Sequence, residues 1–283
     1  MNNYEIAFQG EHYAFSELAA KKFLGESTVC HPKESFDQVF QTVRKNENIL
    51  GIIPIENTLS GSIHQNFDLF LENDVKIVGE VRFRIELHLI AMSGVKFSDI
   101  KKVYSHPAAL GQCRDFWARH RDVEIIPSYD TAGSVKLIAK NGAKDAAAVA
   151  SRQAAEDYNM NIIFSEIEDY KGNYTRFLII SNHDVNFGPA NKTSIVFTAG
   201  HKPGALFKSL SVFFLRDINL LKIESRPLRW KPWQYLFYLD LEGNMNDQQT
   251  KNAMRHLEEI TEFIKVLGSY PAAKNDEKQK NEK

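Results

Sequence analysis

Four short polar segments each follow an apolar run and could bind an anion. They are Gln9-Gly10 ahead of residues 15–17, and residues 54–58, 105–107 and 128–132. Each joins a strand end to a helix start, where free backbone N–H groups and the helix dipole favour negative charge. The simpler interpretation is that Ser16, Thr58 and Asp130 only cap helices. Because such corners converge at the carboxyl ends of strands in a parallel sheet, we favour one shared crevice for an anionic small molecule.

A fifth segment, residues 172–177, begins a strand with Thr175 and Arg176. Arginine offers a planar fork for a carboxylate, and threonine offers a small hydroxyl donor. Neighbouring strand residues point to opposite faces, so both line one wall only where the turn bends. Glu56 and Asn57 follow an apolar strand and are expected at the lip of the crevice. The alternatives are a surface glutamate beside a turn-forming asparagine, and a surface ion pair for Arg176.

The sequence lacks the common signatures of nucleotide, metal and covalent serine chemistry. It has no GxGxxG after a strand, and no GxxxxGK[ST], HExxH, CxxC or GxSxG motif. Its 9 histidines show no metal-ligand spacing. We therefore expect no cofactor and no metal, and either acid–base or purely positional catalysis on a small molecule.

Charge and composition exclude several classes of partner. The chain has 283 residues with 35 Lys+Arg and 36 Asp+Glu, and this balance argues against a nucleic-acid partner. No apolar run approaches the roughly 20 residues of a spanning helix, so no membrane partner is expected. The N-terminus does not look like a signal peptide. Cys30 and Cys113 are too few for a disulfide framework. Together these features predict a cytoplasmic protein.

The first part of the chain alternates strands and helices. We expect strands at 4–9, 49–55, 102–105, 123–127, 146–150, 162–167 and 175–181, and an extended stretch at 75–92. We expect helices at 15–24, 34–45, 62–71, 107–120, 130–140 and 152–158. Ser16 can cap the first helix and Gly25 can end it. The alternation predicts an α/β fold with a mostly parallel sheet.

The order of the expected strands and helices changes after residue 182. Residues 183–192 are predicted to be a linker, because they contain Gly188 and Pro189. Strand, helix, strand, strand, helix, strand then follow at 193–198, 204–216, 220–224, 235–241, 247–261 and 264–268. This βαββαβ order is the ferredoxin-like split unit. We therefore expect a catalytic domain at 1–182, a second domain at 193–271 and a disordered tail at 272–283.

With these segments in order, the sequence resembles the prephenate dehydratase family over nearly its whole length. The family's motifs appear as Gln9-Gly10 with residues 15–20, residues 54–58 with Gly61, residues 105–110, and Thr175-Arg176-Phe177. The second domain resembles an ACT domain through Gly-Ala-Leu-Phe at 204–207 and Glu-Ser-Arg-Pro at 224–227. The chain departs from the family pattern at three places. His12-Tyr13 stands where a second glycine is usual, Thr58 replaces serine, and Ala108 replaces glutamine.

The resemblance implies a two-lobed catalytic domain similar to periplasmic binding proteins, with the active site in the cleft between the lobes. Lobe one would comprise about residues 1–78 and the returning segment after Asn161, and lobe two about residues 79–160. The implied reaction is the decarboxylating dehydration of prephenate to phenylpyruvate in phenylalanine biosynthesis. Aromatisation of the ring drives this reaction, which agrees with the missing cofactor motifs.

The resemblance also assigns roles to the residues of the motifs. Thr175 would donate a hydrogen bond to the departing hydroxyl, and Arg176 would hold the pyruvyl carboxylate. Because a threonine hydroxyl is too weak an acid to give up a proton, a relay through Glu56, His106 or water is needed. The remaining substrate-binding residues would be Gly10, Asn57, Thr58, Ser105, His106 and Thr131.

The ACT resemblance implies feedback by L-phenylalanine and a homodimer or homotetramer. The allosteric residues would be Gly204, Ala205, Leu206, Glu224, Ser225, Arg226 and Pro227. An open sheet edge and an apolar helix face favour pairing with a second copy. Two alternatives stay open from the sequence. The chain could be an arogenate dehydratase, or a non-catalytic module that binds an amino or keto acid and carries an ACT sensor.

Overall fold

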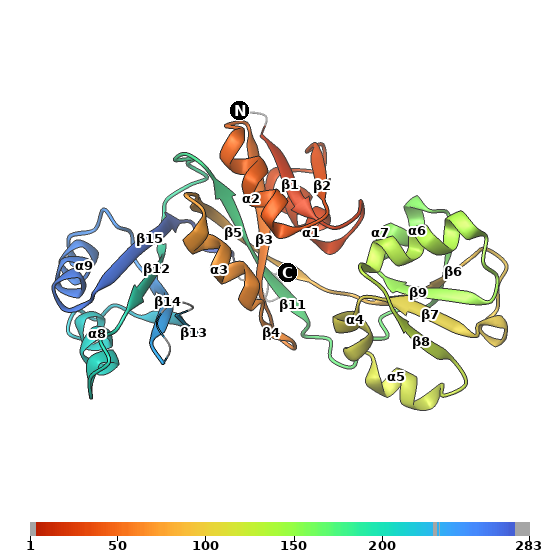
Figure 1. Ribbon diagram of the computed structural model, residues 1–283. Helices are drawn as coiled ribbons and strands as arrows, with labels where there is room; N and C mark the ends of the chain where they lie inside the picture. Colours follow the sequence, from red (N-terminus) through yellow and green to blue (C-terminus); the bar gives the residue numbers. More distant parts are fainter. Residues whose placement is uncertain (1–3, 229–230, 232, 275–283) are drawn as a thin grey trace, which may run out of the picture. The chain divides into compact units, whose positions relative to one another are not determined.

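The computed structural model describes residues 4–228, 231 and 233–274, and the described residues form three β-sheets with flanking helices (Figure 1). The chain divides into two compact units. Unit 1 comprises Met1–Thr42, Asn48–Ile63 and Arg82–Phe177, and unit 2 comprises Val43–Glu47, His64–Val81 and Leu178–Lys283. The prediction of an α/β protein with several sheets is confirmed.

The first sheet has the strand order β2-β1-β3-β11-β5, with β4 paired to β3. Its strands are β1 (Glu5–Gln9), β2 (Cys30–Lys33), β3 (Ile49–Asn57), β4 (Gly61–Ser62), β5 (Lys76–Arg84) and β11 (Tyr174–Ser181). β1 pairs in parallel with β2 and β3, as the alternating pattern predicts. The apolar run of β3 continues through Asn57, so Glu56 and Asn57 lie on the strand itself rather than in the turn after it.

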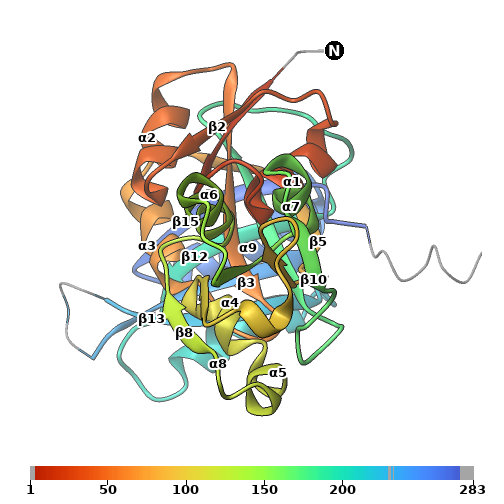
Figure 2. The same cartoon turned by 90° about the vertical axis from the view of Figure 1, so that its right-hand side faces the viewer.

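The second sheet lies within unit 1 and has the order β10-β6-β9-β7-β8, and we use the name lobe two for the part of unit 1 that contains it. Its strands are β6 (His88–Ala91), β7 (Lys102–Ser105), β8 (Glu124–Pro127), β9 (Ala146–Ala150) and β10 (Asn161–Phe164). Its helices are the short 3-10 helix η1 (Phe97–Asp99), α4 (Pro107–Gly111), α5 (Arg114–Arg119), α6 (Thr131–Asn141) and α7 (Arg152–Asp157). Figures 1 and 2 show α5 and α6 on opposite faces of this sheet. Phe116 and Trp117 of α5 join Val103, Ala147 and Val149 in one core.

Lobe one of unit 1 is the part up to Ile63, with β1–β4, helix α1 (Phe15–Leu24) and most of helix α2 (Phe36–Lys45). The approximate lobe boundaries expected from the resemblance each fall a few residues before the crossing in the structure. β5 stays in the first sheet through Arg84, well beyond residue 78. On the return, β10 pairs with β6 of the second sheet, so lobe two continues beyond Asn161 to Phe164.

Several local predictions need correction. The expected helix at 107–120 is two helices, because the chain leaves helical geometry at Gln112 and Cys113. Ser16 does not cap α1: its N-cap is Ala14, and no side-chain cap bond forms there. Strand β2 was not expected, because its sequence, CHPK, has neither alternation nor β-branched residues. Gly25 does end α1, with φ 113°.

Unit 2 contains the third sheet, which has the order β13-β14-β12-β15. Its strands are β12 (Lys192–Thr198), β13 (Leu220–Pro227), β14 (Tyr235–Glu242) and β15 (Phe263–Tyr270), with helices α8 (Ala205–Phe214) and α9 (Gln248–Ile260). Its three strand pairs are all antiparallel. Val212 and Phe213 of α8 and Met254 and Leu257 of α9 share one core with this sheet. The predicted βαββαβ order is confirmed.

The third sheet is bonded to helix α3 (His64–Glu72) and to β5 within unit 2. The Tyr238 hydroxyl donates to the carbonyl of Phe67 at 2.8 Å. Lys192 and Glu80 form a buried ion pair with Nζ and Oε2 2.6 Å apart. Breaking such a pair would leave one buried charge without its partner, so it fixes β12 against β5.

The predicted domain limits and the compact units divide the chain differently. Residues 64–81 belong to unit 2, although they lie inside the predicted catalytic domain 1–182. Of the predicted tail, Ala272 and Ala273 donate backbone hydrogen bonds to Asn191 and Glu80 at 2.8 and 3.1 Å. Residues 275–283 lie outside the described residues. Among the helices in the described part of the chain, none has the length and apolar character needed to cross a membrane.

Candidate active site

Asn57, at the end of β3, is the centre of a buried amide network in unit 1. Its Oδ1 accepts the backbone N–H groups of Leu59 and Ser60, both at 2.9 Å. These two bonds fix the orientation of the amide, because only the oxygen can accept them. The amide nitrogen Nδ2 therefore points to β11, where it lies 3.0 Å from the Thr175 hydroxyl oxygen.

Two further amides complete this network and join the lobes. Asn57 Nδ2 also donates to Asn173 Oδ1 at 2.8 Å, and Asn173 Nδ2 donates to Gln112 Oε1 at 2.9 Å. Gln112 Nε2 donates to Ser60 Oγ at 3.0 Å. Gln112 follows α4 in lobe two, whereas Asn57 and Ser60 belong to lobe one. The geometry of Thr175 thus depends on side chains from both lobes.

The Thr175 hydroxyl is prepared to act as a donor. Thr175 is 8% exposed, and its Oγ1 accepts a hydrogen bond from Asn57. A hydroxyl that accepts one bond keeps its own proton for another partner. A substrate oxygen placed beside Thr175 would therefore meet an O–H group whose direction the amide has already restricted.

Arg176 lies against Glu56, with Nη1 and Oε1 3.6 Å apart. The arginine is 8% exposed, while the Glu56 side chain is 32% exposed. Three contacts join β3 to β11: the Thr58 N–H donates to the Tyr174 carbonyl, the Asn57 side chain donates to Thr175, and Glu56 forms an ion pair with Arg176. One residue number falls as the other rises, which is the order expected of antiparallel strands. Cross-strand partners share a face and successive residues alternate, so the Asn57–Thr175 and Glu56–Arg176 pairs lie on opposite faces.

The glycine corner of lobe one meets the Asp130 corner of lobe two. Gly10 has φ 119°, and a Cβ there would lie 3.0 Å from Asp130 Oδ2. Asp130 caps α6 by accepting the N–H of Gly133 at 2.7 Å. Burial raises the pKa of Asp130, although the bond from Gly133 opposes the shift. Two of the four predicted corners are therefore in contact, and the cap interpretation of Asp130 is also correct.

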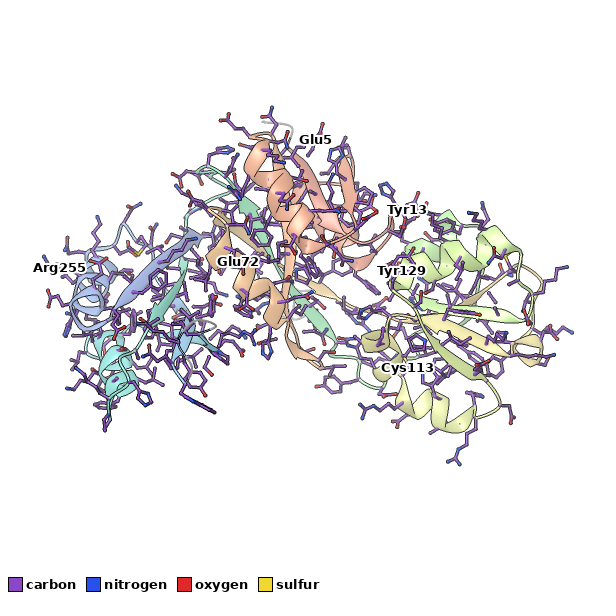
Figure 3. All side chains as sticks on the ribbon, viewed as in Figure 1. Glu5, Tyr13, Glu72, Cys113, Tyr129 and Arg255 are labelled. Carbon is purple, nitrogen blue, oxygen red and sulfur yellow. The ribbon has the colours of Figure 1, made fainter. Side chains whose placement is uncertain are left out.

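Tyr13 explains the departure from the family's second glycine. Its φ is 71°, in the left-handed region that costs a residue with a side chain about 1–2 kcal/mol. Bonds on both sides hold this conformation: Tyr13 N–H donates to Glu17 at 2.6 Å, and Ser151 Oγ donates to the Tyr13 carbonyl at 3.0 Å. Figure 3 labels Tyr13 in lobe one and Tyr129 in lobe two. The Tyr129 hydroxyl donates to Glu11 at 3.1 Å, so it adds a second tie between the lobes.

The other predicted substrate-binding residues differ in their burial and in the hydrogen bonds that they already make. Ser105 is fully buried, and its hydroxyl donates to the Val149 carbonyl at 2.6 Å, so it holds β7 to β9. His106 is exposed and caps α4, with Nδ1 accepting the Ala108 N–H at 3.2 Å. Partial burial of its ring lowers the pKa of His106, which favours a neutral imidazole. Thr131 is half-buried at the first position of α6.

Thr58 has a structural task beside the network. Its Oγ1 donates to the Gly172 carbonyl at 2.9 Å and accepts the Tyr174 N–H at 3.0 Å. It therefore caps no helix but closes the turn that leads into β11. Serine, usual in the family at this position, could make the same two bonds.

Sequence reasoning missed two members of the network, Gln112 and Asn173. Asn173 stands in the turn that carries Thr175, and an amide two residues from the key hydroxyl could have drawn attention to it. Gln112 carries no such signal, because it lies in a segment whose periodicity predicts an uninterrupted helix. Among the described residues, no group of three or more His, Cys, Asp or Glu side chains could hold a metal ion.

Comparison with known protein families shows to which family the chain belongs. The family model for prephenate dehydratase matches residues 6–185. The chain belongs to the prephenate dehydratase family. It is 45% identical over 277 residues to arogenate dehydratase/prephenate dehydratase 2 of Arabidopsis thaliana, and the match covers 94% of this chain and 72% of the relative. The chain is therefore an enzyme of this family.

Solved structures agree on the fold. The prephenate dehydratase of Arthrobacter aurescens, solved in complex with L-Phe, superposes with a TM-score of 0.86 at 28% identity, covering 94% of this chain and 89% of its own. GqqA, described as a novel type of quorum quenching acylase, gives a TM-score of 0.84 at 30% identity, covering 94% and 97%. Because one fold carries these two descriptions, the chemistry of the site must decide the activity.

Proposed function

We propose that the chain catalyses the decarboxylating dehydration of prephenate to phenylpyruvate. The bond between the ring and its carboxylate breaks, and CO₂ leaves. The electron pair enters the ring, and the C–O bond of the ring hydroxyl breaks. The departing hydroxide takes up one proton and leaves as water. Only the hydroxyl needs help from the protein, because aromatisation drives the remainder.

The observation that carries this proposal is the oriented hydroxyl of Thr175. Asn57 occupies one lone pair of its oxygen at 3.0 Å, so the O–H group can donate to the departing hydroxyl. A donor aimed at developing negative charge stabilises the transition state more than the ground state. The threonine passes on no net proton by itself, so a relay through water, Glu56 or His106 must deliver one.

Arg176 is proposed to hold the pyruvyl carboxylate. This assignment now has a condition, because Arg176 faces Glu56 at 3.6 Å and lies on the other strand face from the Thr175 hydroxyl. A substrate carboxylate must share the guanidinium with Glu56 or replace it. If Arg176 instead only positions β11 beside β3, its loss will lower kcat and leave KM unchanged.

The first experiment measures turnover of prephenate by the purified chain, following phenylpyruvate by absorbance. We expect saturable activity, with kcat between about 1 and 10³ s⁻¹. A rate no higher than that of the uncatalysed reaction would overturn the proposal. Parallel assays with arogenate compare kcat/KM, because the Arabidopsis relative carries both activities in its name. A larger kcat/KM with arogenate would favour the second candidate function.

GqqA is described as an acylase, and amide hydrolysis requires a different site chemistry from the proposed dehydration. Hydrolysis of an amide needs a nucleophile activated by a neighbouring base. Thr175 accepts from an amide nitrogen, which cannot remove a proton, so the described contact favours donation over nucleophilic attack. A non-catalytic binding module stays possible only if prephenate binds without turnover, and the same assay decides this.

We propose further that the catalytic domain is two-lobed like periplasmic binding proteins, and that the βαββαβ unit is an ACT domain that senses L-phenylalanine. Support comes from the Gly-Ala-Leu segment at the start of α8, where Gly204 has φ 77°. The Glu-Ser-Arg-Pro segment ends β13. The L-Phe complex of the Arthrobacter relative agrees with a phenylalanine site in this family.

Helix α3 offers a route from this segment to the active site. Glu224 pairs with His64 at 3.1 Å, and Arg226 donates to Asp68 at 3.1 Å. Both partners lie on α3, which follows β4 directly in the chain. β4 pairs with the end of β3, with Gly61 opposite Asn57. A ligand that moves Glu224 or Arg226 can thereby act on the segment that holds Asn57.

The test of regulation is a titration of L-Phe against prephenate turnover by the full chain. We expect sigmoidal inhibition in the wild type and weaker inhibition in Gly204→Val, because valine is strained at φ 77°. A matched control is Gly94→Val, at a glycine with φ 82° in lobe two. Equal inhibition of wild type and Gly204→Val, or none in either, would refute the site.

We propose a homodimer or homotetramer in the cytoplasm. Exposed apolar side chains on α8 support self-association, with Phe207 75% and Phe214 78% exposed. Both cysteines, Cys30 and Cys113, are free, in keeping with a reducing compartment. Light scattering of the wild type and of Phe214→Ser tests the assembly: a monomer in both would refute it.

A further inference from the structure

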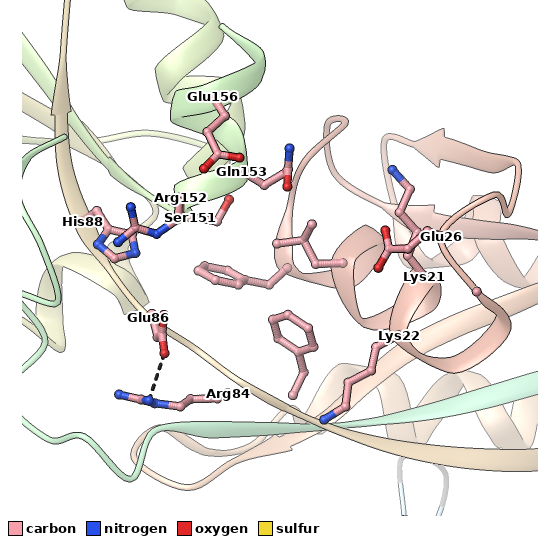
Figure 4. A pocket seen from close by; sticks show the side chains of 14 residues that line it. Lys21, Lys22, Glu26, Arg84, Glu86, His88, Ser151, Arg152, Gln153 and Glu156 are labelled. Carbon is pink, nitrogen blue, oxygen red and sulfur yellow. Dashed lines mark ion pairs between the residues drawn. The ribbon is translucent and has the colours of Figure 1, made fainter. Parts of the chain in front are cut away.

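A cavity of about 750 Å³ lies in unit 1 between α1 of lobe one and α7 of lobe two (Figure 4). The end of β5, the start of β6 and the segment between them also line the cavity. None of the residues assigned above to catalysis or substrate binding lines it. Its volume lies within the range of about 300–1,000 Å³ that is typical of small-molecule sites.

His88 places a hydrogen-bond donor without an acceptor in the wall of this cavity. The residue is 0% exposed, and its Nδ1 accepts the backbone N–H of Glu166 at 3.1 Å. A neutral imidazole that accepts through Nδ1 carries its proton on Nε2. Within the described part of the chain, this buried Nε2 has no hydrogen-bond partner. Burial, followed by the positive charge of Arg152, lowers the pKa of His88, so the ring stays neutral.

Arg152 supplies a cation beside this donor. Figure 4 draws Arg152 next to His88, and its charge acts on the imidazole. The structure gives Arg152 no hydrogen bond or ion pair with any described residue. The cavity lining has three other cations, of which Lys22 donates to the Arg82 carbonyl at 3.1 Å and two are neutralised by carboxylates. Lys21 pairs with Glu17 at 2.9 Å, and Arg84 pairs with Glu86 at 2.9 Å.

Part of the cavity lining is apolar. Phe15 and Leu18 of α1 and Phe83 of β5 contribute to it, and the two phenyl rings lie 6.5 Å apart between centroids. Glu26 and Glu156 also line the cavity. A ligand with a second carboxylate would meet one of these acids, which disfavours a dicarboxylate such as the proposed substrate.

We propose that this cavity is a second ligand site, which binds a monocarboxylate with an aromatic body. The carboxylate accepts hydrogen bonds from the Arg152 guanidinium and, once the cavity wall opens to expose the buried Nε2, from His88 Nε2–H, and the ring packs against Phe15 and Phe83. Such a ligand contacts both lobes at once, because α1 and α7 belong to different lobes. The proposal does not depend on the assigned reaction, since its test measures binding alone.

The test is calorimetric titration of the full chain with 3-phenylpropanoate, an aromatic monocarboxylate without an amino or keto group. We expect saturable binding to the wild type and at least tenfold weaker binding to Arg152→Gln and His88→Asn. The asparagine oxygen takes the place of Nδ1 and keeps the bond to Glu166, so only the Nε2 donor is lost. Arg121→Gln removes an exposed arginine of the same lobe outside the cavity and should change affinity less than twofold.

Three results would overturn the proposal. The first is absence of binding up to about 10 mM ligand. The second is unchanged affinity in Arg152→Gln, which decides the matter even if His88→Asn does not fold, because Arg152 is exposed. The third is loss of binding in Arg176→Gln with full binding in Arg152→Gln, which would place the ligand at the Thr175 site.

Discussion

Replacing Thr175 by alanine should separate catalysis from stability. Asn57 Nδ2 has three acceptors, at 2.8 Å on Asn173, 3.1 Å on Tyr174 and 3.0 Å on Thr175. Its two hydrogens therefore keep partners when the threonine hydroxyl is removed, and we expect a stability loss of only about 1 kcal/mol. The departing hydroxyl of the substrate, in contrast, loses its positioned donor. This should lower kcat by about 10²-fold or more, equivalent to about 2.7 kcal/mol of activation free energy.

The assay is steady-state turnover of prephenate together with a thermal melt of each variant. Thr175→Ser should retain most of the activity, because it keeps the hydroxyl. Thr42→Ala is the matched control, since its hydroxyl donates at 2.7 Å to Gln38 within α2 and plays no part in the network. If Thr175→Ala turns over prephenate within threefold of the wild type, the hydroxyl is not the donor. An equal loss of turnover in Thr42→Ala would show that the lower activity reflects lower stability and not loss of the donor.

Three further predictions concern groups around the network. Arg176→Lys keeps the charge but loses the fork, so KM should rise about tenfold with little change in kcat; a fall in kcat alone would make Arg176 a positioning residue. Gln112→Ala should lower kcat about tenfold, because the amides that orient Thr175 lose their tie to lobe two; unchanged kinetics would refute this. Asp130→Asn keeps the cap on Gly133 and removes a half-buried charge, so Tm should rise at pH 7. Because the folded-state pKa of Asp130 is raised, its charge destabilises the fold above that pKa. The gain should therefore vanish as the pH falls below about 4, and a gain that is constant with pH would contradict it.

The sequence was most informative where local pattern and burial agree. The run ILGIIPI predicts a strand buried on both faces, and all its residues except Ile49 are buried in β3. The βαββαβ order follows from periodicity alone, because each element of that unit has a regular pattern. The corner at Asp130 is also predictable, since a cap residue before a helical pattern is a local signal.

Long-range pairings could not be predicted from single residues. Gln112 and Asn173 are 61 positions apart, and their bond depends on two lobes brought together by chain crossings. The crossings could be expected only approximately, because the extended stretch 75–92 contains strands of two different sheets. Tyr13 shows the same limit, since its positive φ is held by Ser151, a residue 138 positions away.

The register of β3 against β11 pairs the motif at residues 54–58 with the motif at residues 175–177. Asn57 meets Thr175 and Glu56 meets Arg176, so each polar pair shares one face. A shift of one residue would place Glu56 opposite Thr175 and would give the hydroxyl a charged acceptor in place of an amide donor. Thr175 would then direct its proton to that carboxylate and would no longer offer it to the substrate. The buried apolar residues of both strands, Ile52 to Ile55 and Phe177 to Ile180, resist that shift. The apolar core of the first sheet thereby fixes the direction in which the Thr175 hydroxyl, proposed as the catalytic donor, can donate.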